Sequence, residues 1–178
     1  MIDGPTESSD RSSTAANKTL VRAFVEDIFI ERDMTKLEGY FDGNNYINHN
    51  PRIADGVDHL RDRLLSTTRT PFRFDTVRMV LGEGGFVLVV TEGTFGDRNT
   101  SFYELFRVQS GKIAERWDVV EEVVPAGRIK EHKWQVLKTG TTRREYLGTT
   151  QQMKLLSWSQ VVGSCFRKGA KICDPKSP

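Results

Sequence analysis

The chain has 178 residues, of which 37% are hydrophobic and 28% are charged, a composition typical of a globular protein with its own core. No apolar run approaches the roughly 20 residues of a membrane-spanning helix, and the chain does not open with a basic segment followed by an apolar stretch. Its two cysteines, Cys165 and Cys173, are too few for a disulfide framework or a metal cluster. These features argue against a membrane protein and a disulfide-stapled module, and they predict a cytoplasmic protein without a metal.

The net charge of +2 conceals a division along the chain. Residues 1–125 contain 15 Lys and Arg against 21 Asp and Glu, whereas residues 126–178 contain 11 against 3. We expect a disordered, Ser-rich segment at 1–15, one domain at 16–125 and a largely disordered basic tail at 126–178. The tail could be an arm for an acidic partner, a docking segment or a translated alternative exon. It has too few aromatic or repeated basic units to predict specific nucleic-acid binding.

Three helices are predicted in the first part of the domain. The first is amphipathic and could be capped by Ser13 or Thr14. Asp33 could cap a second short helix, and Asp55 could cap a third. The apolar positions that support the three helices are, in order, Leu20, Val21, Phe24, Val25, Ile28 and Phe29, then Leu37, Tyr40 and Phe41, then Val57, Leu60, Leu64 and Leu65.

Strands are predicted from Phe72 onward. "GEGG" reads as a hairpin turn rather than a phosphate-binding loop, because an apolar strand and not a helix follows it. "SFYELFRV", "QSGK" and "IAERWDVV" form a second hairpin whose turn centres on Ser110 and Gly111. Three helices followed by four antiparallel strands predict an α+β fold with a pocket between the two layers.

The segment "YINHNPRIADG", residues 46–56, places a histidine before a proline. Because Pro51 keeps Asn50 out of helical geometry, His49 should lie in an extended or turn segment. The turn could hold His49 for chemistry, or His49 could simply satisfy local hydrogen bonds.

Two stretches, "YINHNPRIADGVDHL" and "ELFRVQSGKIAERWDVVEEVVP", resemble the SnoaL-like polyketide cyclases of the nuclear transport factor 2-like (NTF2-like) superfamily. The resemblance covers residues 16–125. It implies a cone-shaped α+β barrel with N-terminal helices packed on a curved antiparallel sheet, usually a homodimer, with a deep pocket and no cofactor. Members that are enzymes close polyketide rings by intramolecular aldol condensation, with an aspartate at the position of Asp118. Two departures are Arg116, where a histidine is common, and Asn48, where a glutamine is common.

The chemistry expected of Asp118 is removal of a proton next to a carbonyl group, with a donor to stabilise the enolate. Strand alternation complicates this role. Symmetric pairing about the second hairpin turn places Asp118 opposite Tyr103 and away from the core, with Trp117 pointing inward. A β-bulge would reverse the sense of one segment. Asp118 could otherwise be a salt-bridge partner of Arg116 or Arg107.

The sequence therefore predicts a cofactor-independent acid/base enzyme acting on a polyketide-like or other carbonyl substrate, as an aldol cyclase, isomerase or related lyase. The alternative is a non-catalytic module of the same fold that binds a small ligand or a protein partner. Glu104 and Glu115 are interpreted as rim charges and His59 as a solvated side chain. The candidate site residues are Asp118 and His49 as catalytic groups, and Tyr46, Asn50, Tyr103, Trp117 and Arg116 as substrate-binding groups.

Overall fold

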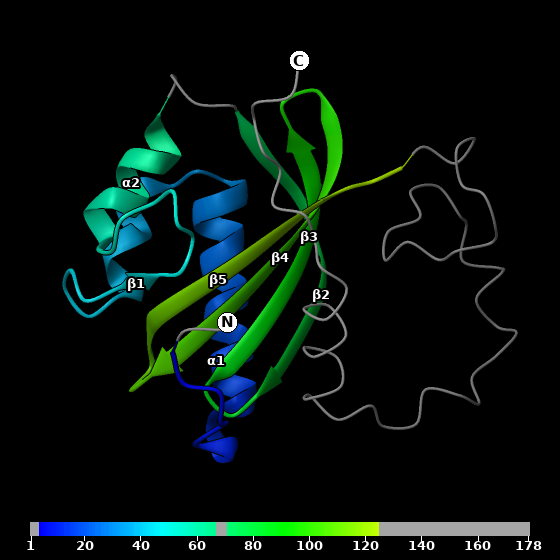
Figure 1. Cartoon of the computed structure of the whole chain (residues 1–178). Helices are drawn as coiled ribbons and strands as arrows, with labels where there is room; N and C mark the ends of the chain where they lie inside the picture. The colour runs from blue at the N-terminus through cyan, green and yellow to red at the C-terminus, as the bar shows by residue number, and fades with distance from the viewer. Residues whose placement is uncertain (1–3, 67–70, 125–178) are drawn as a thin grey trace, which may run out of the picture. The chain divides into compact units, whose positions relative to one another are not determined.

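The computed structural model describes residues 4–66 and 71–124. Its helical elements precede its long strands, as predicted, and Figure 1 shows their arrangement. The helical elements are η1 (Arg11–Ser13), α1 (Thr14–Phe24), η2 (Val25–Ile30), η3 (Met34–Tyr40) and α2 (Val57–Leu65), and the strands are β1 (Ile47–Asn48), β2 (Phe72–Glu83), β3 (Phe86–Phe95), β4 (Arg98–Gln109) and β5 (Lys112–Glu122). The predicted basic tail and its two cysteines lie outside the described residues.

The first helix forms where the apolar spacing predicts it, and its last turns widen into the π-helical segment η2. Its apolar side chains are buried against the sheet. The predicted cap is wrong, because Ser13 makes no capping hydrogen bond. The Thr14 hydroxyl instead accepts a hydrogen bond from the Gly84 N–H at 2.8 Å, so the helix start is tied to the first hairpin turn.

The two shorter helices differ in how they begin. Asp33 caps η3 as predicted, with its carboxylate accepting the Thr35 N–H at 3.1 Å. Asp55 does not cap α2, because Gly56 occupies the cap position with a positive φ of 99°. The Asp55 carboxylate instead accepts the Asn48 N–H at 2.8 Å and ties the loop before α2 to β1.

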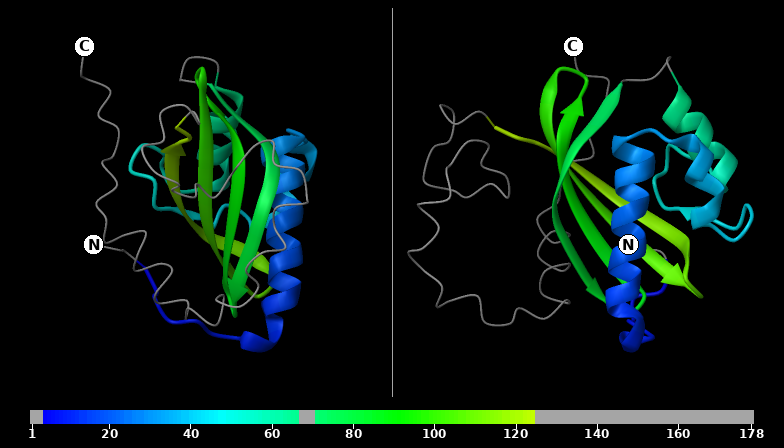
Figure 2. Two further views of the ribbon diagram at one scale, coloured as in Figure 1. Left: turned by 90° about the vertical axis from the view of Figure 1, so that its right-hand side faces the viewer. Right: turned by 180° about the vertical axis from the view of Figure 1, so that it is seen from behind.

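The sheet is curved and open, with strand order β1-β5-β4-β3-β2. Its long strands are antiparallel neighbours, whereas the two-residue strand β1, which was not predicted, pairs parallel with β5. The helices lie on one face of the sheet, as the two views of Figure 2 show. We call this the inner face and the opposite side the outer face. The predicted α+β architecture, with helices packed on a curved sheet, is confirmed.

Both predicted hairpin turns are present. The first contains Gly84 and Gly85, and the second has Ser110 and Gly111 at φ values of 49° and 71°. Two successive residues with positive φ are typical of a turn whose twist matches that of the flanking strands.

A β-bulge decides which face Asp118 occupies. Val108 pairs with Ile113 in the expected register, but Arg107 pairs with Glu115, so Ala114 is the extra residue. Asp118 therefore lies opposite Glu104, and the predicted pairing with Tyr103 is wrong. The bulge places Phe102, Glu104, Phe106, Arg116 and Asp118 on the inner face and Tyr103, Leu105, Arg107, Glu115 and Trp117 on the outer face. The prediction that Trp117 points into the core is wrong for the same reason.

Residues 8–14, part of the segment expected to be disordered, run along the β2–β3 hairpin. The Ser8 hydroxyl donates to the Glu83 carbonyl at 2.8 Å, and the Gly85 N–H donates to the Ser9 carbonyl at 2.9 Å. None of the helices in the described ranges is long and apolar enough to span a membrane.

Candidate functional site

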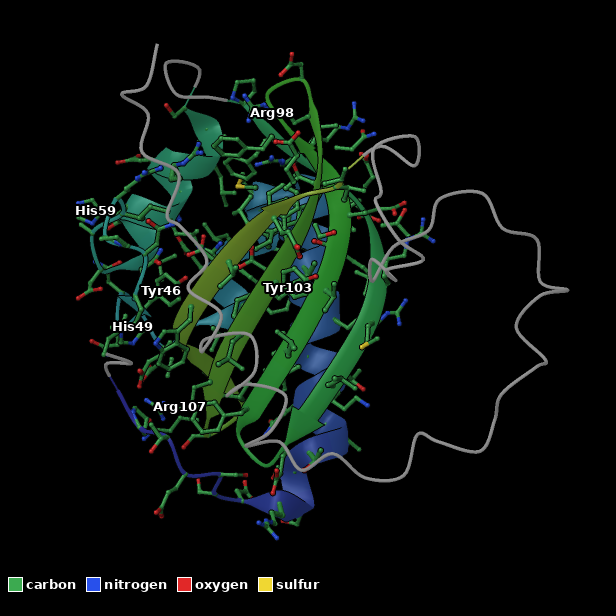
Figure 3. All side chains as sticks on the ribbon, turned by 45° about the vertical axis from the view of Figure 1, so that its right-hand side comes forward. Tyr46, His49, His59, Arg98, Tyr103 and Arg107 are labelled. Carbon is green, nitrogen blue, oxygen red and sulfur yellow. The ribbon has the colours of Figure 1, made fainter. Side chains whose placement is uncertain are left out.

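Charged and polar side chains gather on the inner face where β1 meets β5. Along residues 46–50 the side chains alternate, so Tyr46, Asn48 and Asn50 point inward while Ile47 and His49 point outward. The inner cluster consists of Tyr46, Asn48, Asn50, Glu104, Arg116 and Asp118. Figure 3 labels Tyr46 beside the β5 edge of the sheet.

Asp118 keeps a contact with solvent, since its side chain is 10% exposed. Its Oδ2 accepts a hydrogen bond from the Asn50 amide at 3.0 Å and lies 3.9 Å from the Arg116 guanidinium. The carboxylate is thus held by one neutral donor and one cation.

Glu104 and Arg116 form a buried ion pair, with the Arg116 Nε 2.5 Å from the Glu104 carboxylate. Their side chains are only 1% and 7% exposed. Burial raises the pKa of Glu104 to about 7, because loss of hydration outweighs the nearby guanidinium. Glu104 and Asp118 raise the pKa of Arg116 far above its usual range. Arg116 therefore stays charged between the two carboxyl groups, while Glu104 changes protonation near neutrality.

Three polar atoms of the inner cluster have no hydrogen-bond partner: the Tyr46 hydroxyl, the Asn48 amide nitrogen and one carboxylate oxygen of Glu104. All three are buried, and a buried polar atom without a partner costs about 1–3 kcal/mol. Burial also raises the pKa of Tyr46, which keeps its hydroxyl protonated as a donor. Unsatisfied donors and acceptors beside a titratable pair are a recognised feature of functional sites.

Three of the predicted site residues lie on the outer face. The Tyr103 hydroxyl donates to the Glu121 carboxylate at 3.0 Å. The His49 ring stacks on Trp117 at 4.2 Å and its Nε2 lies 2.9 Å from the Glu115 carboxylate. The sheet therefore separates His49, Trp117 and Tyr103 from Asp118, whereas Tyr46, Asn50 and Arg116 lie beside it.

Sequence reasoning missed two members of the inner cluster. Glu104 was interpreted as a rim charge because it alternates with aromatic residues, yet it is almost fully buried. Its position opposite Asp118 depends on the bulge at Ala114, which has no signal in the local sequence. Asn48 was noted as a departure from the family pattern and was given no role.

Side chains fill the space around the inner cluster, since Tyr46, Glu104 and Arg116 are 2%, 1% and 6% exposed. Two surface depressions lie elsewhere. One of about 450 Å³ lies between the loop after Asn50 and α2, and one of about 680 Å³ lies along α1. Within residues 4–66 and 71–124, no three His, Cys, Asp or Glu side chains are grouped so as to hold a metal ion.

No family model and no curated protein matches the sequence. Solved structures do match it. A candidate ketosteroid isomerase from Kribbella flavida DSM 17836 superposes with a TM-score of 0.57 at 15% identity, over 72% of this chain and 98% of the other. A candidate SnoaL-like polyketide cyclase from Jannaschia sp. CCS1 gives 0.51 at 15% identity, over 66% and 92% of the two chains.

The fold is thus an α+β cone-like arrangement of helices on an open, curved sheet. The NTF2-like fold expected from the sequence is confirmed, and the likeness to these structures is one of fold alone.

Proposed function

We propose that this protein is a cofactor-independent acid/base enzyme that removes a proton next to a carbonyl group of a small substrate. Isomerisation, aldol cyclisation and related lyase reactions all begin with this step. The observation that carries the proposal is the position of Asp118 on the inner face, held by Asn50 and Arg116 and directly opposite Glu104.

Asp118 is the proposed base. Both of its contacts, from Asn50 and from Arg116, reach Oδ2, which orients Oδ1 as the atom that takes the proton. The carboxylate is mostly shielded from water, so water competes little with a substrate for it. A proton removed from the substrate carbon leaves negative charge on the carbonyl oxygen, and this charge needs a donor.

Two groups of the inner cluster are proposed donors to that oxygen. The Tyr46 hydroxyl is buried, protonated and without a partner. Glu104 retains a proton over part of the neutral range, because its pKa is raised to about 7. An aspartate base combined with a tyrosine and a neutral carboxylic acid is the arrangement by which ketosteroid isomerases stabilise an enolate.

Substrate entry requires rearrangement, because side chains fill the space around Tyr46 and Glu104. The contact of Asp118 with solvent marks the side from which a substrate would approach. The filled interior also supports the alternative, a non-catalytic module of the same fold that binds a small ligand or a protein. Ligand binding without chemical change would favour this alternative.

The test is a screen of cyclic ketones and polyketide-like dicarbonyl compounds in D₂O. Each compound is recovered, and its molecular mass is measured by mass spectrometry. Deuterium uptake or a new product, at a rate above that in buffer, supports the enzyme. Compounds that bind and are recovered unchanged support the binding module.

We also propose that the protein forms a homodimer through the outer face of the sheet. Two apolar rows cross this face, one formed by Leu81, Leu88 and Leu105 and the other by Met79, Val90 and Tyr103. Leu81 and Met79 are 37% and 41% exposed. A second copy would bury these rows, since exposed contiguous apolar surface favours association.

A further inference from the structure

We propose that His49, Glu115, Trp117 and Arg107 form an outer lock that holds Asn50 against Asp118, so that His49 is a positioning residue. This inference rests on the proposed function for the role of Asp118, and on the contacts themselves for the role of the lock. Figure 3 labels His49 and Arg107, two of its members.

The lock and the inner cluster share the same two pieces of backbone. On β5, Glu115 and Trp117 point outward and alternate with Arg116 and Asp118, which point inward. In the β1 segment, His49 points outward and precedes Asn50, which points inward. A side-chain contact on the outer face therefore fixes the position of the neighbouring residue on the inner face.

Backbone pairing alone gives this junction little support. β1 pairs with β5 at two positions, Ile47 with Glu115 and Asn48 with Arg116, and the His49 N–H adds one bond to the Arg116 carbonyl at 2.9 Å. So short a parallel edge strand has few hydrogen bonds to hold its register. Besides the Asp55 carboxylate, which accepts the Asn48 N–H, the side chains on the outer face are further contacts that hold it.

Those outer contacts are close and shielded. The His49 ring lies nearly parallel to the Trp117 ring, with an angle of 3° between their planes. The His49 Nε2 lies 2.9 Å from one Glu115 oxygen, and the Arg107 Nε lies 2.6 Å from the other. The side chains of His49 and Glu115 are 12% and 4% exposed, so water competes little for these bonds.

The N-terminal segment packs directly on the lock. A Cβ atom added to Gly4 would lie 2.9 Å from a Glu115 carboxylate oxygen and 3.0 Å from the Trp117 ring. Gly4 also has a positive φ of 97°. Only glycine fits this approach without strain, so the backbone at Gly4 covers the Glu115 carboxylate and the Trp117 edge.

Asn50 is the residue whose position against Asp118 depends on the outer lock. Its side-chain oxygen accepts the Arg52 N–H at 3.0 Å, and its amide nitrogen donates to Asp118. With the His49 ring removed, the segment loses its contacts to Trp117 and Glu115. It keeps the β1 pairing, the bond from the Asn48 N–H to Asp55 and its own turn bonds, so Asn50 is held less firmly against Asp118.

The test uses NMR of the full chain and needs no substrate. The side-chain amide resonance of Asn50 is assigned by its loss in Asn50→Asp, and its position in Asp118→Asn defines the state in which the bond to a carboxylate is absent. In His49→Ala this resonance should move more than halfway toward the Asp118→Asn position. In His49→Gln, which keeps a donor for Glu115, it should return most of the way to the wild-type position.

The matched control is Arg22→Ala, which removes an exposed i,i+4 ion pair of α1 far along the chain from β1. It should leave the Asn50 resonance unchanged. If His49→Ala does not fold, Glu115→Gln replaces it, since this variant weakens the contact to His49 without opening a cavity. An unmoved Asn50 resonance in a folded variant of His49 or Glu115 overturns the lock.

A kinetic readout separates the lock from the proposed function. If the enzyme proposal holds, His49→Ala should lower kcat about tenfold with little change in KM, because misplacing a catalytic group slows the chemical step. If the protein proves to have no such activity, the NMR result still decides the lock. If Asp118→Asn abolishes turnover while the Asn50 resonance in His49→Ala stays at its wild-type position, the lock is overturned and the proposed function stands.

Discussion

Glu104 and Asp118 lie directly opposite each other on β4 and β5, and both side chains point to the inner face. Arg116 contacts both carboxyl groups. One of these carboxyl groups is deeply buried and the other lies at the edge of solvent, although both face the same cation. Burial raises the pKa of Glu104 to about 7, so this group can hold a proton near neutral pH.

Replacing Glu104 by Gln should flatten part of the pH dependence of stability. The pKa of folded Glu104, about 7, lies above its ordinary 4.5, so between these values the folded protein holds a proton that the unfolded chain has lost. This contribution to the free energy of unfolding is complete below about pH 4.5 and is lost as pH rises through about 7. Its size is on the order of 3–4 kcal/mol, since one pKa unit is worth about 1.4 kcal/mol.

Urea unfolding of the wild type and Glu104→Gln at pH 5 and pH 8 checks this expectation. The wild type should lose more stability than the variant between the two values. Equal losses would mean that Glu104 is ionised throughout this range.

Replacing Tyr46 by Phe separates a catalytic hydroxyl from a structural one. The Tyr46 hydroxyl is buried without a partner, so its removal should leave the free energy of unfolding unchanged or raise it by about 1 kcal/mol. If the hydroxyl donates to the enolate oxygen, turnover should fall by about a hundredfold. Thermal unfolding and steady-state kinetics on the same preparation measure the two effects. A stable variant with full turnover would remove Tyr46 from the mechanism.

Replacing Leu81 by Arg should shift the proposed homodimer toward monomer. Leu81 stands in an apolar row of the outer face and is 37% exposed, so a dimer through this face would bury the introduced charge. The control is Leu65→Arg on α2, where the side chain is 60% exposed and away from the sheet. Sedimentation at micromolar concentration should give a wild-type dimer, a dimer for Leu65→Arg and a weaker one for Leu81→Arg. A wild-type monomer would contradict the proposal.

The helices and long strands were predictable because their apolar periodicity depends only on local sequence. Both hairpin turns were predictable for the same reason, since glycine marks them. The face of the sheet on which Asp118 lies was not predictable. One extra residue at Ala114 reverses the alternation of side chains along β5, and only the three-dimensional pairing reveals it. The two-residue strand β1 gave no signal either, since its partner β5 lies more than sixty residues away in the chain.

The candidate site was predicted in part. Tyr46, Asn50 and Arg116 do lie beside Asp118, and the proline turn does keep His49 in extended backbone. His49 points to the other face because residues of an extended segment alternate, and the sequence does not say which parity faces inward. Glu104 was overlooked because burial of a charged side chain follows from packing against Arg116, a contact across two strands.

The most direct test of the central claim, that Asp118 is the base, compares the wild type with Asp118→Asn. The measurement is deuterium uptake at the α-carbon of a ketone in D₂O, followed by NMR, with 2-tetralone as the probe and near-UV circular dichroism as the check of folding. The wild type should accelerate uptake above the rate in buffer, and folded Asp118→Asn should be slower by a hundredfold or more, as expected for loss of a general base. Wild type and folded Asp118→Asn exchanging deuterium at the same rate would contradict the claim.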